Sequence, residues 1–173
     1  MRIVGLRRSA ILCGAIALAA SAFIASADAQ NAAPPTPAGA SGPSPTKQAV
    51  ENRRAAYTLI GNSFRYFGAV AKGAAPYDEA EATKRAARIA LLAAIPAENF
   101  PEGSNVGEPD SKAKADIWSN RSDFEKKLRD FQAHAAELVE VNAKEKGATE
   151  ALKAAVAALG QDCKGCHDSY KAK

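Results

Sequence analysis

Two cysteines and a histidine near the end of the chain are the residues best suited to carry chemistry. The segment Cys163-Lys164-Gly165-Cys166-His167 puts two thiols three residues apart, on one face if the segment is helical. Such thiols can add to both vinyl groups of one haem, and the C-x-x-C-H order is the pattern of c-type haem attachment. His167 can then reach the iron as an axial ligand. The motif predicts one covalently bound haem c.

The same residues have two less favoured uses. A thiol redox pair normally opens a helix that follows a strand, whereas Cys163 and Cys166 lie in the last expected helix, and no alternating strand pattern occurs after residue 46. A zinc site would have three ligands in the motif, and His134 would have to supply the fourth. Both uses remain alternatives to haem.

The first 29 residues predict export. Residues 1–29 combine three arginines, an uncharged run rich in Ala, Ile and Leu over 9–24, and small-x-small cleavage sites, and we expect cleavage after Ala29. The apolar run is too short for a comfortable membrane span. Removal of Cys13 with this segment leaves two cysteines, both in the motif. We therefore expect a periplasmic protein without a membrane span.

Charge excludes one class of partner. The net charge of +4 falls to +2 without residues 1–29, since 20 basic and 18 acidic side chains remain. No basic stripe is left, so we expect no nucleic-acid binding. Residues 30–46 contain five of the nine prolines and few large apolar side chains, which predicts a flexible, polyproline-like tether that acts as a spacer.

The remainder, 47–173, has a helical pattern. We expect four helices, over about 47–72, 78–95, 112–144 and 149–171, because apolar residues recur at spacings of three and four. The segment 96–112 holds three prolines and two glycines and is expected to be a loop, of a length that is often functional. Four amphipathic helices with mostly short connections predict an all-α, antiparallel up-down-up-down bundle. The haem would lie near the C-terminal end of the last helix.

Five features, in this order, carry a resemblance. They are Arg53, Val-Ala-Lys-Gly at 70–73, Ala-Pro-Tyr-Asp at 75–78, Asp-Ile-Trp-Ser at 116–119 and Cys-Lys-Gly-Cys-His-Asp-Ser-Tyr at 163–170. Together they make the chain from about residue 50 resemble cytochrome c′, a class II c-type cytochrome. The resemblance implies a bundle haem with His167 as the only protein ligand of the iron. It also implies binding of nitric oxide and carbon monoxide, or electron transfer.

The resemblance further implies positions for individual side chains. Arg53 and Arg54 would lie near the haem edge, Ser104 and Asn105 would contact the porphyrin, and Tyr57 would lie over the distal face. The family often forms dimers through its first two helices, so a homodimer is among the expected partners, with an unidentified redox protein and the diatomic gases.

Composition limits what can occupy the sixth iron position. The only methionine is Met1, in the segment expected to be removed, so a His/Met pair is not available. His134 falls beside the apolar stripe of its helix, which favours a partly exposed histidine over the alternative, an axial ligand. A neutral phenol is a poor ligand, and we predict that the Tyr57 ring shields the site while Ile60 and Phe64 complete a dry wall. A plain core role for Tyr57 is the alternative.

Three more residues are expected around the haem. Lys171 stands one turn beyond His167, where the family typically carries arginine, and lysine lacks the planar fork of that residue. A solvated basic C-terminus is the other interpretation of Lys171. Trp118 and Tyr170 are expected to pack against the haem or the core.

These features predict a five-coordinate, high-spin haem protein that binds nitric oxide and carbon monoxide, carries electrons, or does both. One alternative is a low-spin six-coordinate electron carrier of the same fold. A weak peroxidase is another, but peroxide cleavage needs a distal group that moves protons. Tyr57 and Arg53 are the nearest candidates and are poor bases, so we expect no enzyme.

Overall fold

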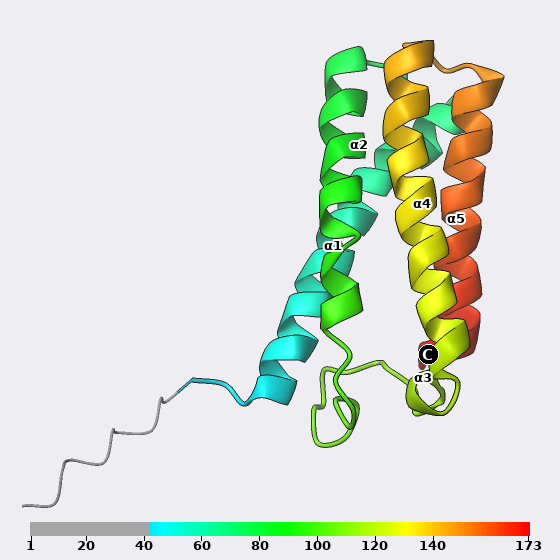
Figure 1. The fold of residues 1–173 in the computed structure, drawn as a ribbon. Coiled ribbons are helices and arrows are strands. Elements are labelled where there is room, and N and C mark those ends of the chain that lie inside the picture. Colours follow the sequence, from blue (N-terminus) through cyan, green and yellow to red (C-terminus); the bar gives the residue numbers. More distant parts are fainter. Residues whose placement is uncertain (1–41) are drawn as a thin grey trace, which may run out of the picture. The chain divides into compact units, whose positions relative to one another are not determined.

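The computed structural model describes residues 42–173; the expected signal segment and most of the expected tether lie outside the described residues. Four long helices dominate: α1 (Pro45–Ala71), α2 (Glu79–Leu92), α4 (Arg121–Glu145) and α5 (Glu150–Tyr170). Two short helices, η1 (Ile95–Glu98) and α3 (Asp116–Ser119), lie between α2 and α4. α1 packs on α2, α2 on α4, α4 on α5, and α5 returns to α1 (Figure 1). The predicted all-α four-helix bundle is confirmed.

Side-chain caps set where three of the helices begin. Ser44 accepts a hydrogen bond from the Lys47 amide (3.2 Å) ahead of α1, and Asp78 accepts one from the Glu81 amide (2.8 Å) ahead of α2. Thr149 caps α5 in the same way. Each cap satisfies an amide that has no partner inside the helix, which is why Ser, Thr and Asp favour this position. The cap predicted at Asp78 is confirmed.

The expected start of the third helix at residue 112 is wrong. Residues 112–114 are extended, α3 is one turn, and a break at Asn120 separates it from α4. The cause is a long-range pairing: the Lys114 amide donates to the Tyr170 carbonyl (3.0 Å), and the Ala172 amide donates to the Lys112 carbonyl (2.8 Å). These bonds satisfy backbone groups that a helix would otherwise pair locally.

The buried apolar side chains form two clusters. The larger one joins the four long helices and includes Phe67, Ile89, Leu138 and Leu159. The smaller one contains Phe100, Ile117, Phe124, Leu128 and Tyr170. Burying side chains of this size contributes about 1.5–3 kcal/mol each. Tyr57 packs against both clusters, which places it between them.

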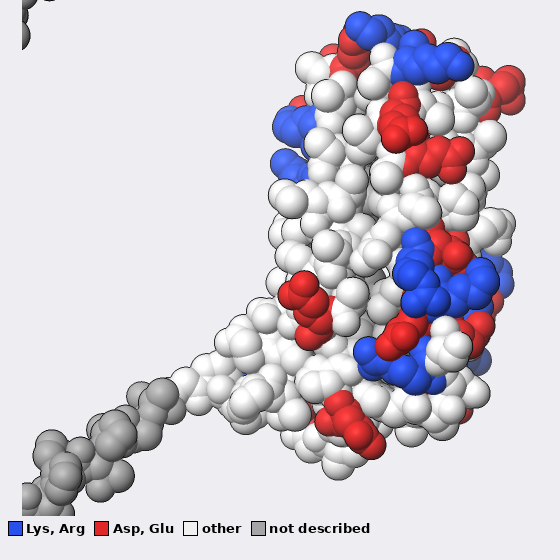
Figure 2. All heavy atoms as spheres, in the orientation of Figure 1, with Lys and Arg blue, Asp and Glu red and all other residues white. Residues whose placement is uncertain are grey.

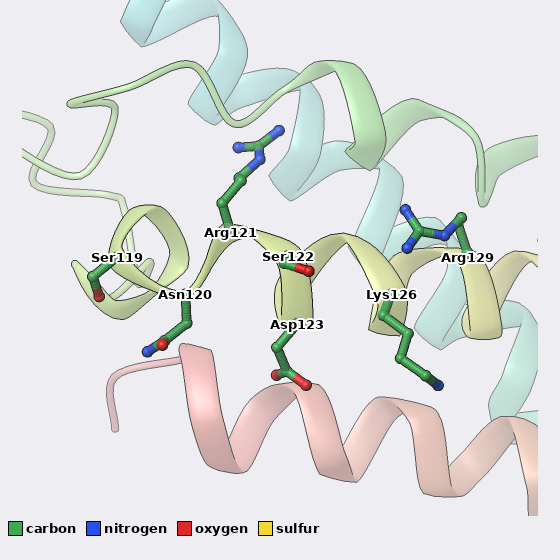
Figure 3. A pocket seen from close by; sticks show the side chains of 7 residues that line it. All are labelled: Ser119, Asn120, Arg121, Ser122, Asp123, Lys126 and Arg129. Atoms are coloured by element: carbon green, nitrogen blue, oxygen red, sulfur yellow. The ribbon is translucent and has the colours of Figure 1, made fainter.

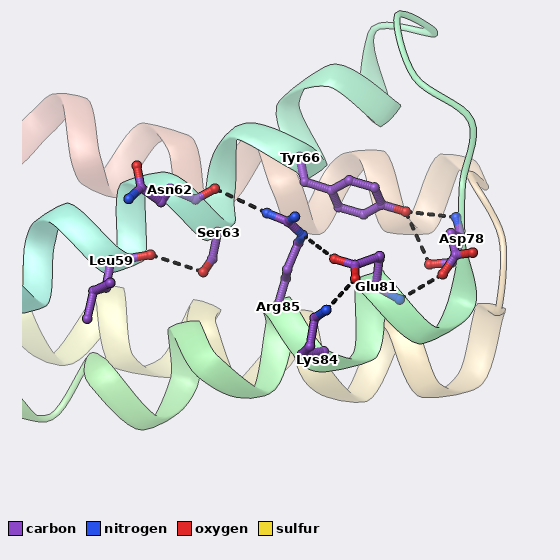
Figure 4. A network of polar contacts seen from close by, with 8 residues as sticks. All are labelled: Leu59, Asn62, Ser63, Tyr66, Asp78, Glu81, Lys84 and Arg85. Atoms are coloured by element: carbon purple, nitrogen blue, oxygen red, sulfur yellow. Dashed lines mark hydrogen bonds and ion pairs between the residues drawn. The ribbon is translucent and has the colours of Figure 1, made fainter.

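A polar network fixes the α1–α2 hairpin (Figure 4). The Asp78 amide donates to the Tyr66 hydroxyl (2.7 Å), which donates in turn to the Asp78 carbonyl (3.1 Å). Arg85 pairs with Glu81 (2.9 Å) and also reaches the Asn62 carbonyl of α1 (3.3 Å). The two helices are thus held at the turn and again near the middle of α1.

The surface of the bundle mixes charges. On the face shown in Figure 2, lysines and arginines alternate with acidic residues over α4 and α5 rather than forming a basic stripe. Within residues 42–173, no helix combines the length and the apolar character that crossing a membrane requires.

Candidate haem site

A cavity of about 430 Å³ lies among α1, α4, α5 and the segment that leads into α3. Its volume is within the range of small-molecule and cofactor sites, and most of its lining is apolar. The lining residues are Arg53, Arg54, Tyr57, Thr58, Ile60, Gly61, Phe64, Phe100, Asp110, Lys112, Ala113, Ile117, Phe124, Lys127, Leu128, Phe131, Asp162, Cys163, Cys166, His167, Tyr170 and Lys171. The whole C-x-x-C-H motif therefore opens into one cavity.

The two thiols are free and half-buried on α5. Burial raises the pKa of Cys163, and it raises the pKa of Cys166 to about 11. Both groups stay protonated at neutral pH, whereas a redox-active pair depends on a lowered thiol pKa. Their raised pKa values therefore disfavour the thiol redox alternative.

His167, an exposed residue of α5, has a pKa below the ordinary value of a histidine. Burial, and then the nearby Lys171 charge, lower the pKa of His167. The imidazole is therefore neutral at neutral pH, which is the form that binds a metal ion.

His134 does not line the cavity. Its Nδ1 lies 2.6 Å from the Asp162 carboxylate, and this hydrogen bond raises the pKa of His134. The side chain is partly exposed, as predicted. From this position it supplies neither a sixth iron ligand nor the fourth ligand of a zinc site.

One wall of the cavity comes from α1. Tyr57, Ile60, Gly61 and Phe64 all line it. Burial is the main cause that raises the pKa of Tyr57 above its ordinary value, so its phenol stays neutral. A neutral phenol can donate a hydrogen bond but binds iron poorly.

Arg53, at the edge of the cavity, is tied to a loop. The side chain is only 4 % exposed, and its guanidinium donates to the Asn99 carbonyl (2.9 Å), the Ser104 hydroxyl (2.7 Å), the Ser104 carbonyl (2.9 Å) and the Ser111 hydroxyl (2.7 Å). It also lies 4.5 Å from the centroid of the Phe100 ring. Four charge-assisted hydrogen bonds and a cation–π contact satisfy this buried cation.

Three residues predicted to contact the haem lie outside the cavity lining. Ser104 is fully buried beneath Arg53, and Asn105 is half-buried in the same loop. Trp118 packs on the smaller cluster, and its indole donates to the Pro101 carbonyl (3.1 Å). The structure thus brings Arg53, Arg54 and Tyr57 to the cavity, and keeps this second group behind its wall.

Sequence reasoning missed several of the lining residues. Lys127 and Asp162 were not singled out, although each lies on a helix next to a residue that was. Helical spacing could have indicated Lys127, because it stands one turn from Phe124 and from Phe131 of the apolar stripe. Phe100 belongs to the loop, where no periodic pattern exists to mark it.

The rim of the cavity carries more basic than acidic side chains. Arg54, Lys112, Lys127 and Lys171 line it together with Asp110 and Asp162, and Arg54 pairs with Asp110 (2.9 Å). The two carboxylates of a haem suit such a rim, and its flat apolar body suits the interior. The donor set, two thiols followed by a neutral imidazole, also fits a covalently attached haem. The residues present therefore fit the group that the motif predicts.

A second depression, of about 550 Å³, is formed by polar side chains at the start of α4 (Figure 3). It is open surface that holds none of the motif residues. Asp123 points from it toward α5, where the Tyr170 hydroxyl donates to its carboxylate (2.6 Å). Burial, with this hydrogen bond, raises the pKa of Tyr170 to about 12. Tyr170 is thus a buried anchor of the end of α5.

Comparisons with known proteins agree with the site. A sequence model of the family described as Cytochrome C' matches residues 48–171. The cytochrome c' of Rubrivivax gelatinosus is 37% identical over 125 residues, covering 72% of this chain and 95% of the relative. That of Alcaligenes xylosoxydans xylosoxydans is 34% identical over 127 residues, with 73% and 95% covered.

Solved structures agree as well. Cytochrome c prime from Shewanella frigidimarina has a TM-score of 0.68 and 38% identity, covering 74% of this chain and 97% of that one. A ferrous variant of the Alcaligenes xylosoxidans protein with bound nitric oxide has a TM-score of 0.67 and 32% identity, with 76% and 99% covered. The chain therefore belongs to the cytochrome c′ family, whose members hold one covalent haem c.

Proposed function

We propose that this protein is a periplasmic haem protein with a five-coordinate, high-spin iron, which binds nitric oxide and carbon monoxide and exchanges electrons with a separate redox protein. The observation that carries the proposal is the composition of the cavity wall. Among the described residues that line it, His167 alone has an imidazole, and the sole methionine of the sequence is Met1. Haem iron supplies reversible one-electron chemistry and a position for a diatomic ligand.

The motif residues have distinct roles in this proposal. Cys163 and Cys166 attach the group through thioether bonds, and the neutral imidazole of His167 is the single axial ligand. The basic rim receives the carboxylates. Export of the chain, cleavage after Ala29 and a flexible tether over 30–46 remain predictions, supported by the residue pattern at the N-terminus.

The α1 wall selects the ligand. Tyr57, Ile60 and Phe64 present apolar surface, and entry into such a site requires a ligand to shed its hydration. This transfer costs more free energy for an anion or a water molecule than for a small uncharged gas. The wall therefore favours nitric oxide and carbon monoxide.

A peroxidase function has less support. Peroxide cleavage requires a group that accepts and returns a proton within hydrogen-bond reach. Arg53 directs four donors into its loop, and the raised pKa of Tyr57 keeps the phenol protonated. We therefore propose binding and electron transfer rather than an enzyme.

Absorption spectra test the central proposal. The purified protein is expected to show high-spin bands in the ferric and ferrous states, and a shift of the ferrous bands when carbon monoxide is added. Both results follow from an iron held by His167 alone. A low-spin ferrous spectrum that carbon monoxide leaves unchanged would show that a sixth ligand occupies the site.

We further propose that two copies associate through α1 and α2. The support is the pair of large apolar side chains that these neighbouring helices expose, Leu59 (46 % exposed) on α1 and Leu91 (75 % exposed) on α2, whose burial between two copies would be favourable. Sedimentation is expected to give twice the chain mass, and Leu59→Glu with Leu91→Glu is expected to give monomers. Val106→Glu, on the loop and 73 % exposed, is the control that leaves the mass unchanged. A monomeric unsubstituted protein contradicts the proposal.

A further inference from the structure

Residues 99–114, here named the strap, cross one end of the bundle between η1 and α3. Figure 1 shows this segment at the end where the chain terminates, with the C-terminus beside α3. The strap is bonded to α1 at several points and to the last residues of α5 at others. Since α5 carries His167 and α1 carries Tyr57, the strap joins the two helices that face the candidate iron.

Arg53 makes the most extensive contact between α1 and the strap. Its guanidinium reaches the strap at Asn99, Ser104 and Ser111, with four hydrogen bonds of 2.7–2.9 Å. Because this cation is buried, each lost partner leaves a donor without water, so the strap is held in one position. A second contact is the ion pair between Arg54 and Asp110 (2.9 Å), which is exposed and weaker.

The contact with α5 is a short antiparallel pairing. Ala113 forms an isolated bridge with Lys171, and on either side the Lys114 amide donates to the Tyr170 carbonyl (3.0 Å) and the Ala172 amide donates to the Lys112 carbonyl (2.8 Å). The Lys114 ammonium also donates to the Ser169 carbonyl (2.7 Å). The last turn of α5 thus has its exposed carbonyls bound by the strap.

Ser111 connects the two contacts. Its hydroxyl accepts from Arg53 (2.7 Å) and also from the Ala113 amide (3.3 Å), so one side chain fixes both the α1 cation and the residue paired with Lys171. The Lys171 amide in turn donates to the His167 carbonyl (3.2 Å). A path of hydrogen bonds, joined by short stretches of backbone around the Ala113–Lys171 bridge, therefore runs from α1 through the strap to the histidine.

We propose that Arg53 is a positioning residue that, through Ser104 and Ser111, sets the placement of the last turn of α5 and with it the orientation of His167. Arg53 lies on α1, and its effect is expected on α5, at the other end of the bonded path. The part that concerns the iron rests on the proposed function, whereas the mechanical link between α1 and α5 does not.

The test uses the mature, haem-loaded protein with Ser104→Ala and Ser111→Ala combined. Neither serine lines the cavity, so the haem keeps its contacts while Arg53 loses its hydroxyl partners. Ser122→Ala, an exposed serine of α4, is the matched control. Amide hydrogen exchange is measured over 112–114 and 168–173, and the iron–histidine stretching band of the ferrous protein is measured by resonance Raman spectroscopy.

The double variant is expected to exchange about tenfold faster in both segments, the change that accompanies loss of a charge-assisted hydrogen bond, and to shift or broaden the iron–histidine band. The control is expected to match the unsubstituted protein. Faster exchange confined to the strap, with 168–173 and the band unchanged, overturns the proposal. If the double variant does not fold, Ser111→Ala alone is measured in the same way.

A C-terminal truncation tests the same link from the side of α5. Deleting Ala172 and Lys173 removes the pairing with Lys112 and no cavity-lining residue. It is expected to shift or broaden the iron–histidine band, as the double variant does, and to speed exchange at 112–114; an unchanged band contradicts the proposal. A protein without bound haem would refute the proposed function alone, because the exchange measurements still decide whether the strap links α1 to α5.

Discussion

Replacing both Cys163 and Cys166 with alanine is expected to give a protein whose haem, if taken up at all, is extracted completely by acid–acetone. Thioether bonds resist this treatment, whereas ligation by His167 alone does not survive protonation of the imidazole. Since both thiols open into the cavity beside His167, no other described cysteine can replace them. The measurement is the haem absorbance that stays with the precipitated protein, against that of the unsubstituted chain.

The same substitution is expected to destabilise the fold strongly. At about 24 cal/mol per Å³, leaving a cavity of 430 Å³ unfilled would cost on the order of 10 kcal/mol. That figure is an upper limit because water can enter, yet it equals the whole stability of a typical domain. We expect the apoprotein to lose its cooperative thermal transition, as followed by circular dichroism.

The single variants provide the control. Cys163→Ala and Cys166→Ala each leave one thiol, so each is expected to retain covalent haem through one bond and a cooperative transition at a lower temperature. A double variant that keeps its colour after extraction would refute attachment through these residues. A double variant that unfolds like the unsubstituted protein would instead refute the role of the haem in filling the core.

The parts of the fold that could be predicted are those encoded by neighbours in the sequence. The helical stripes, the cap at Asp78 and the C-x-x-C-H motif each depend on spacings within one helix, and the structure confirms the four-helix bundle they imply. The start of the third helix could not be predicted in this way. Residues 112–114 have no local reason to be extended; their reason is the pairing with Tyr170 and Ala172, which lie more than 50 residues away in the chain.

The residues of the site also fall into those that helical spacing predicts and those that only tertiary contacts determine. Residues of α1 and α5 that share a helix face with Tyr57 or the cysteines were predicted to border the haem, and they line the cavity. The partners of Arg53 were not predictable, because Ser104 and Ser111 belong to a loop without periodicity. The sequence alone does not reveal whether the guanidinium of an arginine early in a helix binds a cofactor or a loop. The tertiary contacts decide it, and here they commit its donors to the strap.

Tyr57→Ala is expected to increase the rate of carbon monoxide association with the ferrous protein by tenfold or more. The Tyr57 ring lines the cavity and packs against both apolar clusters, and under the proposed function it stands over the open iron position and obstructs the entry of a gas. Removing it lowers the barrier to entry, and each tenfold change corresponds to about 1.4 kcal/mol. The measurement is flash photolysis of the carbon monoxide complex at several gas concentrations.

Tyr57→Phe separates the two properties of this side chain. It keeps the ring and removes the hydroxyl, so it is expected to retain the association rate of the unsubstituted protein if shielding is steric. A rise in the rate for Tyr57→Phe as large as for Tyr57→Ala would assign the effect to the hydroxyl instead. Unchanged rates in both variants would leave Tyr57 as a core aromatic, because a ring that bars no path can be removed without changing the speed of entry. Access would then be set by the remaining α1 side chains, Ile60 and Phe64, and their alanine variants are the ones in which the rate would rise.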